Sequence, residues 1–271
     1  MSQLAGRFHV VVLSCGGLGI EVANDLRTLP GLTQVTLVTT PYSRKPLGLR
    51  GKLKQIHRTQ GWFGFLSVLF SKVKGLLPRV STQASQSVPG QGLHPTIARY
   101  SFPDFHQSEC LDRLRALGAD LGVVAGTYIL KKEVFEIPRL GSINLHSGKA
   151  PEYRGAAPAF WELYNGERSV GITIHRVASE LDAGAILLQE LFPLEASPVI
   201  EPLVYLERYR MEVLRPNGVR MVRQAVARIM QNAVQEQRQD PTKAKTYRSP
   251  DHAAICELRR RVRQRRRERA S

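Results

Sequence analysis

One stretch organises the sequence, and it falls into three pieces: Gly141-Ser-Ile-Asn-Leu-His146, Pro151-Glu-Tyr-Arg-Gly-Ala-Ala-Pro158 and Glu180-Leu-Asp-Ala-Gly184. The first piece is strand-like, and side chains two residues apart on a strand face the same side. Asn144 and His146 are therefore expected to point the same way. A carboxamide beside an imidazole can polarise a carbonyl group and stabilise a developing oxyanion.

Asp182 lies in the third piece, in a turn between two further strand-like runs. A carboxylate there can hold the imidazole in one tautomer or accept the proton that an attacking amine loses. We therefore predict that Asn144, His146 and Asp182 are catalytic. The simpler alternative is an Asn-x-His turn cap with a partly exposed histidine. His175 falls in the middle of the predicted strand 170–177, so we expect it to be structural.

Several motifs then follow one another in a characteristic order: Gly126-Thr-Tyr-Ile-Leu130, the two pieces that begin at Gly141 and Pro151, Val170-Gly-Ile-Thr-Ile-His175, and Leu181-Asp-Ala-Gly184. Together they resemble the folate-dependent formyltransferases, notably methionyl-tRNA formyltransferase and its sugar N-formyltransferase relatives. The resemblance is specific from about Ala119 to Gln189, fainter over the N-terminal hundred residues and absent after about Pro198.

The resemblance implies an α/β architecture, a Rossmann-like formyltransferase fold with a mostly parallel central sheet. The residue pattern after it indicates a helical, Arg-rich C-terminal extension. We expect a catalytic domain over residues 1–198, with an insertion at about 43–95, and a helical extension over 199–271. Within the extension, one apolar stripe recurs at steps of three and four residues, which predicts a helix with one buried face. Its members are Val219, Val222, Val226, Ile229 and Ala233.

The formyl donor implied by the resemblance is 10-formyltetrahydrofolate, with its pterin between the loops 126–130 and 179–182. The cofactor-contact candidates are Tyr128, Ile129, Leu130, Ser179, Glu180 and Leu181. For the first three of these, simple packing is an equal alternative. The oxyanion would be held by Asn144 and by a protonated His146, because a carboxylate nearby keeps more of a histidine charged than its free pKa of about 6.5 allows.

Three glycines follow a buried-strand pattern at Val10 to Ser14 and precede a helical pattern. Such a Gly-rich turn can present backbone N–H groups to an anion. We therefore predict that Gly16, Gly17 and Gly19 contact the substrate. The dinucleotide fingerprint is incomplete, which argues against NAD.

The loop Ser147-Gly-Lys-Ala150 differs from the sequence that is common at this position in the resembled family, Pro-Ser-Leu-Leu. Because this loop would lie beside the attacking amine, Lys149 becomes a candidate contact for a phosphate or a ribose. Arg154 is a further substrate-binding candidate, although together with Gly155 it is better suited to fixing the turn.

The chain has 271 residues, of which 42% are hydrophobic, as expected for a globular protein. Its three cysteines, Cys15, Cys110 and Cys256, fit neither a disulfide framework nor a metal site and indicate a reducing, cytoplasmic setting. The longest apolar stretch is broken by Lys72 and Lys74, so we expect no integral membrane segment.

The net charge is +16, and eight arginines lie between residues 257 and 271. A basic excess favours a polyanionic partner such as tRNA, a nucleotide-linked sugar or the folate glutamate tail; an Arg-rich proteome would explain it equally well. A last helix is expected to begin at Ser249 as N-cap and to run into a solvated tail. Residues 43–80 combine basic and aromatic side chains, typical of a packed insertion or of a surface that docks on tRNA or a membrane.

Three functions are consistent with the sequence. The first is formyl transfer to methionyl-tRNA, which the basic tail favours. The second is formyl transfer to an amino-sugar nucleotide or another small amine, which the altered 147–150 loop favours. The third is a hydrolase that releases formate, or a non-catalytic folate- or RNA-binding relative.

Overall fold

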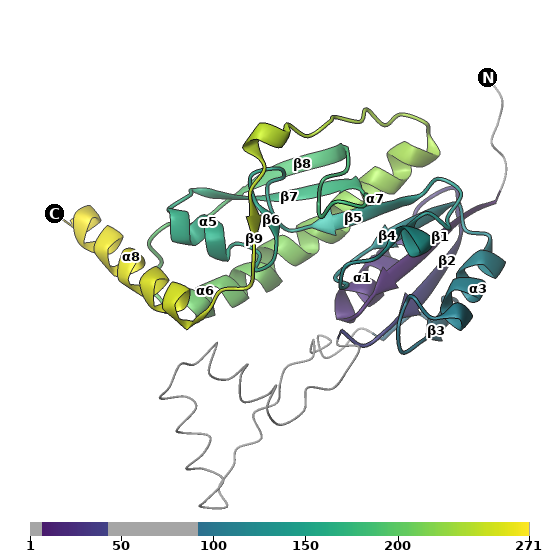
Figure 1. Ribbon diagram of the computed structural model, residues 1–271, viewed down its shortest axis with the longest axis horizontal. Coiled ribbons are helices and arrows are strands. Elements are labelled where there is room, and N and C mark those ends of the chain that lie inside the picture. The colour runs from purple at the N-terminus through teal and green to yellow at the C-terminus, as the bar shows by residue number, and fades with distance from the viewer. Residues whose placement is uncertain (1–6, 43–91, 271) are drawn as a thin grey trace, which may run out of the picture.

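The computed structural model describes residues 7–42 and 92–270 (Figure 1). The basic and aromatic segment 43–80 lies outside the described residues, as does all but the end of the insertion expected at 43–95.

Within the described residues, the strands of the main sheet follow the order β3-β2-β1-β4-β5-β7-β8. They are β1 (Phe8–Ser14), β2 (Leu32–Thr39), β3 (Ala98–Ser101), β4 (Leu121–Val124), β5 (Ser142–His146), β7 (Ser169–Arg176) and β8 (Ile186–Pro193). Neighbours from β3 to β5 are parallel, whereas β7 pairs antiparallel with both β5 and β8. The predicted α/β fold with a mostly parallel sheet is confirmed.

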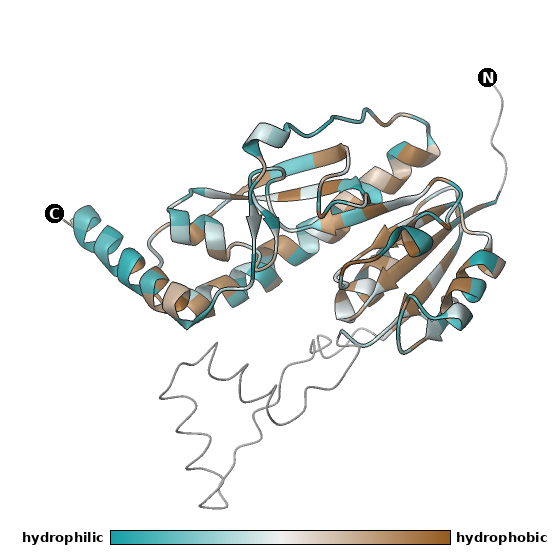
Figure 2. Ribbon diagram, viewed as in Figure 1, coloured by the Kyte–Doolittle hydropathy of each residue, from teal (hydrophilic) through white to brown (hydrophobic). Residues whose placement is uncertain are grey.

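Helices cover both faces of this sheet. They are α1 (Gly17–Leu26), α3 (Ser108–Leu117), α4 (Lys132–Phe135), α5 (Phe160–Asn165), α6 (Pro202–Tyr209), the π-helix η1 (Arg210–Leu214), α7 (Arg215–Met230), the 3-10 helix η2 (Pro241–Lys243) and α8 (His252–Ala270). Strand β1 is buried on both sides, as parallel strands are. Its Val10 and Val12 belong to one apolar cluster with α1 and α7, and its Val11 and Leu13 to another with α3 and α4. Figure 2 shows hydrophobic residues concentrated on the strands.

The C-terminal helices belong to the same core as the sheet. Leu206 of α6 and Met221, Val222 and Val226 of α7 are buried in the cluster that includes Val10 of β1. The helical character expected after residue 199 is therefore present, but position 198 does not divide two hydrophobic cores. Of the predicted apolar stripe, Val222 and Val226 of α7 are buried in the core, as expected, whereas Ala233 lies beyond the end of the helix and is exposed, so the stripe ends earlier than predicted.

The last helix, α8, lies at one end of the molecule (Figure 1). The Asp251 carboxylate accepts a hydrogen bond from the Ala254 N–H at 2.8 Å, so Asp251, and not Ser249, caps the helix. The helix continues to Ala270, and its Leu258 and Val262 are buried. The tail is therefore a docked helix. In the part of the chain that the structure describes, no helix is long and apolar enough to cross a membrane.

Candidate active site

The candidate site lies at the carboxyl ends of the parallel strands, at the point where successive strands begin to be added on the opposite side of β1. Strands β2 and β3 lie to one side of β1, and β4 and β5 lie to the other. Ligands of open α/β sheets bind at such a switch point. The turn after β1 and the loop after β4 meet here, because the Cys15 N–H donates to the Gly126 carbonyl at 3.1 Å.

Strand β5 carries the predicted Asn144 and His146 at its carboxyl end, and β7 runs beside it in the opposite direction. The register places Asn144 opposite His175. The Asn144 Nδ2 donates to Asp182 Oδ1 at 3.3 Å and lies 3.1 Å from His175 Nε2. The structure therefore brings the three predicted catalytic residues together and adds a fourth polar side chain.

The Asp182 carboxylate is the centre of this cluster. Its Oδ2 accepts a hydrogen bond from the Gly155 N–H at 2.8 Å and lies 3.5 Å from His146 Nδ1. Burial opposes ionisation of Asp182, but the hydrogen bond with His175, the His146 ring and the Gly155 N–H outweigh it and lower the carboxyl pKa to about 2. Asp182 is therefore ionised at neutral pH. Its φ of 50° is a left-handed conformation, which aspartate tolerates in turns.

His146 is buried, with 8% of its surface exposed. Its Nε2 lies 2.6 Å from the Tyr153 carbonyl, so Nε2 carries a proton and donates it there. Burial lowers the pKa of His146 and outweighs the opposing effect of Asp182. The prediction that Asp182 keeps His146 charged at neutral pH is therefore wrong, because the sequence indicated the carboxylate but not the burial.

His175, expected to be purely structural, is part of the cluster. Its Nδ1–H donates to the Arg176 carbonyl at 2.8 Å, and its Nε2 lies 3.1 Å from the Asn144 amide nitrogen. The same Nε2 is 3.4 Å from Asp182 Oδ1. His175 therefore orients Asn144 and Asp182. The sequence signal was the hairpin-like pair of strands after the Asn-x-His motif, but it did not specify the register.

The predicted cofactor contacts divide into packed and exposed side chains. Tyr128 is held inward, because its hydroxyl donates to Asp104 at 2.7 Å and accepts from the Phe105 N–H at 2.8 Å. Leu130 is buried in the core beside it, so only its backbone can face a ligand. Ile129 is 68% exposed, and Ser179, Glu180 and Leu181 are exposed as well.

On the predicted substrate side, Gly16 and Gly17 lie at the start of α1, within the turn after β1. Gly19 is buried, and a Cβ there would overlap Ser14, so its role is close packing of helix and strand. The Lys149 ammonium forms an ion pair with Glu152 at 3.0 Å and stays partly exposed.

Arg154 is buried, and all its guanidinium nitrogens donate to protein groups. Its Nη1 bonds Glu180 at 2.7 Å, while Nε and Nη2 both bond the Gln239 amide oxygen. The Gln239 amide nitrogen in turn donates to the carbonyls of Asp182 and Gly184, each at 2.7 Å. The structure thus favours the turn-fixing role of Arg154 over contact with a substrate. Gln239, which carries no motif, was missed.

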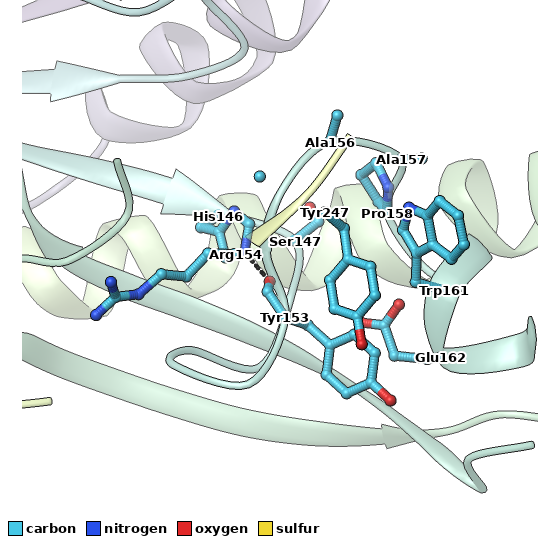
Figure 3. Close-up of a pocket in the computed structure, with 11 residues that line it drawn as sticks. His146, Ser147, Tyr153, Arg154, Ala156, Ala157, Pro158, Trp161, Glu162 and Tyr247 are labelled. Carbon is cyan, nitrogen blue, oxygen red and sulfur yellow. Dashed lines mark hydrogen bonds between the residues drawn. The ribbon is translucent and has the colours of Figure 1, made fainter. Parts of the chain in front are cut away.

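A narrow pocket adjoins His146 on the side of α5 (Figure 3). Tyr247, on the short strand β9 (Thr246–Tyr247), stacks on Tyr153 with ring centroids 5.3 Å apart and on Trp161 at 5.2 Å. Strand β9 pairs with β6 (Arg154–Gly155), so the C-terminal segment forms part of the pocket wall. Within the described residues, no group of three or more His, Cys, Asp or Glu could hold a metal ion.

Comparison with known proteins shows what the residues around this site are similar to. Residues 78–203 match the formyl transferase family model, a range that includes Asn144, His146 and Asp182. Over this range the chain is similar to formyltransferases. It is 36% identical over 116 residues to methionyl-tRNA formyltransferase of Parabacteroides distasonis, which covers 43% of this chain and 34% of that protein. The chain thus spans about a third of this relative's length.

Two solved structures share the fold of this chain. A sugar N-formyltransferase from a Shewanella species superposes with a TM-score of 0.55 at 17% identity, covering 89% of this chain and 76% of the other. A sugar 3N-formyl transferase, solved in the presence of dTDP and 5-N-formyl-THF, superposes with a TM-score of 0.50 at 13% identity, covering 89% and 70%.

Proposed function

We propose that the protein transfers a formyl group from 10-formyltetrahydrofolate to a primary amine. The observation that carries this proposal is the cluster of Asn144, His146 and Asp182 at the carboxyl end of β5. The exposed Ile129 and Leu181 at the tips of the flanking loops offer apolar surface for the pterin. The formyltransferase match and the solved relative with 5-N-formyl-THF support this choice of donor.

Each of the three polar side chains has a role in this reaction. The Asn144 amide is held by contacts of 3.1 and 3.3 Å, at the long end for hydrogen bonds, so it can exchange one of them for the oxyanion that develops on the formyl oxygen. His146 is neutral, and its Nδ1 takes a proton from the amine after attack and returns it to the folate nitrogen. Asp182 stabilises the imidazolium formed in between.

The test is calorimetric titration with 5-formyltetrahydrofolate, followed by formyl-transfer assays against amines and tRNA. Wild type should bind the folate in the micromolar range, and Asp182→Ala should bind it more weakly because the 179–182 loop loses its anchor. Asp112→Ala, which removes an exposed carboxylate on α3, is the matched control. Absence of folate binding by wild type would refute the proposal.

A formyl-releasing hydrolase would use the same cluster. Its signature is formate release from 10-formyltetrahydrofolate without any amine. We expect slow release without an acceptor and acceleration of folate turnover by the correct amine. Rapid release that no amine accelerates would assign the hydrolase function.

The acceptor that the structure favours is a small amine rather than methionyl-tRNA. The arginines that a polyanion would need are partly used to dock α8: Arg261 and Arg265 donate to the carbonyls of Tyr164 and Leu163. Arg266 donates to the Ile200 carbonyl in the same way. Removal of residues 257–271 would also remove the buried Leu258 and Val262, so it would test folding together with binding.

The sharper test of tRNA binding replaces Arg263 and Arg267, which are exposed on α8, by alanine. If tRNA is the acceptor, tRNA retention should fall while the folate affinity stays the same. We expect the double variant to leave formyl transfer to the correct small amine unchanged.

A further inference from the structure

One buried carboxylate next to the candidate site is not used by the mechanism above. Glu162, in the short helix α5, is 3% exposed. Its Oε1 accepts no hydrogen bond from any residue that the structure describes. A buried carboxylate with an oxygen that accepts no hydrogen bond is costly for folding, so its presence indicates a compensating role.

Glu162 lines the same pocket as His146 (Figure 3). Tyr153, Trp161 and Tyr247 contribute aromatic side chains to its lining, and the rest of the lining consists mainly of small residues between Ser147 and Pro158. The space is narrow, with room for about one water-sized group, which is also the size of an ammonium head. Aromatic faces and a carboxylate both attract a cation, and both repel an anion such as phosphate.

None of the charged or titratable groups described around Glu162 places a positive charge beside its carboxylate. Arg154 also lines the pocket, but its guanidinium is bonded to Glu180 and Gln239. Burial raises the pKa of Glu162 to about 7. The backbone N–H of Glu162 acts in the opposite direction, and the negative charge of Glu167 raises this pKa further.

Two other groups complete the surroundings of this carboxylate. Tyr209 of α6 lies near enough to Glu162 for the two groups to interact electrostatically. The Tyr209 hydroxyl, however, donates its hydrogen bonds to the carbonyls of Phe192 and Pro193. His146, on the other wall, has a pKa lowered by burial and is neutral near pH 7. Neither supplies a cation.

We propose that Glu162 binds the ammonium head of the acceptor amine and takes one proton from it. The inference rests on the proposed function and names the acceptor class, a primary alkylammonium compound. In this step one N–H bond of the ammonium breaks and an O–H bond forms on Glu162. The freed lone pair attacks the formyl carbon, and the bond from that carbon to the folate nitrogen then breaks. The second proton of the amine passes through His146 to that nitrogen.

Glu162 and Asp182 differ in how well each can act as the base that deprotonates the amine. An amine must lose its proton before it can attack, and a base with a pKa near the working pH does this best. Asp182, held ionised by its hydrogen-bond donors, is too weak a base for the task. One oxygen of Glu162 lacks a donor, and the pKa of about 7 suits this carboxylate to the task.

In the experiment, methylammonium chloride is titrated into the folate-bound protein at pH 8 and at pH 6. Tryptophan fluorescence reports binding, and sodium chloride keeps the ionic strength constant. A carboxylate with a pKa near 7 is mostly ionised at pH 8 and mostly neutral at pH 6. The affinity of wild type should therefore fall about tenfold between the two. Glu162→Gln should lose binding at pH 8 by tenfold or more and lose the pH dependence. Glu207→Gln, which removes an exposed carboxylate on α6, should behave as wild type.

A second measurement keeps a folding defect apart from a binding defect. Glu162→Leu removes the buried carboxylate and should raise the melting temperature by about 2–4 °C while abolishing methylammonium binding. Equal methylammonium affinity in wild type and Glu162→Gln, or no binding by wild type, would overturn the inference. Folate titration of the same samples separates the two proposals: folate binding without methylammonium binding rejects only the role of Glu162, whereas absence of folate binding rejects the proposed function.

Discussion

Replacement of Asp182 by asparagine tests the electrostatics of the site through folding stability. The carboxyl pKa is about 2 in the folded protein, against 3.8 for the free side chain. A depressed folded-state pKa stabilises the protein above the unfolded-state pKa, and this stability is lost as the pH falls through the folded-state pKa. The difference between the two pKa values corresponds to about 2 kcal/mol at pH 7.

The pH dependence distinguishes this effect from a simple packing defect. Asp182→Asn should be less stable than wild type by about 2 kcal/mol at pH 7 and by nearly as much at pH 4, but by only about 1 kcal/mol at pH 3. Other carboxylates titrate in the same range, but their contributions cancel in the difference between the two proteins.

The assay is urea unfolding of both proteins at pH 7, 4 and 3, followed by tryptophan fluorescence. Asp112→Asn is the control, because this exposed carboxylate should change the free energy of unfolding by less than about 0.5 kcal/mol. A difference between Asp182→Asn and wild type that is absent at pH 7, or that stays constant down to pH 3, would refute the assignment of Asp182 as a buried, donor-stabilised anion.

Three further substitutions test separate parts of the site. His146→Ala should lower kcat by about 100- to 10,000-fold and leave the folate Kd within a few-fold, whereas near-normal turnover would exclude it as the base. Gly155→Ala should cost about 1–3 kcal/mol in urea unfolding, because the residue has φ of 97° and a Cβ would overlap the Tyr247 carbonyl; unchanged stability would contradict the close approach of β6 and β9. Arg154→Lys should weaken folate binding about tenfold in calorimetry, since lysine cannot bridge Glu180 and Gln239, and wild-type affinity would contradict that link.

The sequence was informative wherever the pattern is local. Buried strands such as Val10 to Ser14 have near-continuous apolar runs, and the Asn-x-His spacing places both side chains on one face of a strand. These features predicted the parallel sheet and the position of Asn144 and His146. The folded chain brings Asp182 to them because it lies in the loop between β7 and β8, beside the carboxyl end of β5.

What the sequence could not indicate depends on contacts between distant residues. The register of β7 on β5, which puts His175 opposite Asn144, follows from packing and not from either strand alone. The bond from Arg154 to Gln239 joins residues 85 positions apart, and a single glutamine carries no periodic signal. Burial of His146 also depends on contacts between distant residues. It lowers the pKa of His146, whereas the sequence led us to expect that Asp182 would raise it.

The two carboxylates near His146 show how one fold separates acid–base roles. Burial opposes the ionisation of Asp182, but His175, the His146 ring and the Gly155 N–H outweigh it, so its pKa falls to about 2. Glu162 has comparable burial but an oxygen without a donor, so its pKa rises to about 7. Environments that push two pKa values apart assign a fixed charge to one group and a proton acceptor to the other. The difference lies in the donors: Gly155 on β6 faces Asp182, whereas aromatic rings line the pocket of Glu162. A substitution that gave Glu162 a donor would therefore convert it into a second fixed anion and move the optimum of amine transfer to a higher pH, where the free amine is available without a base.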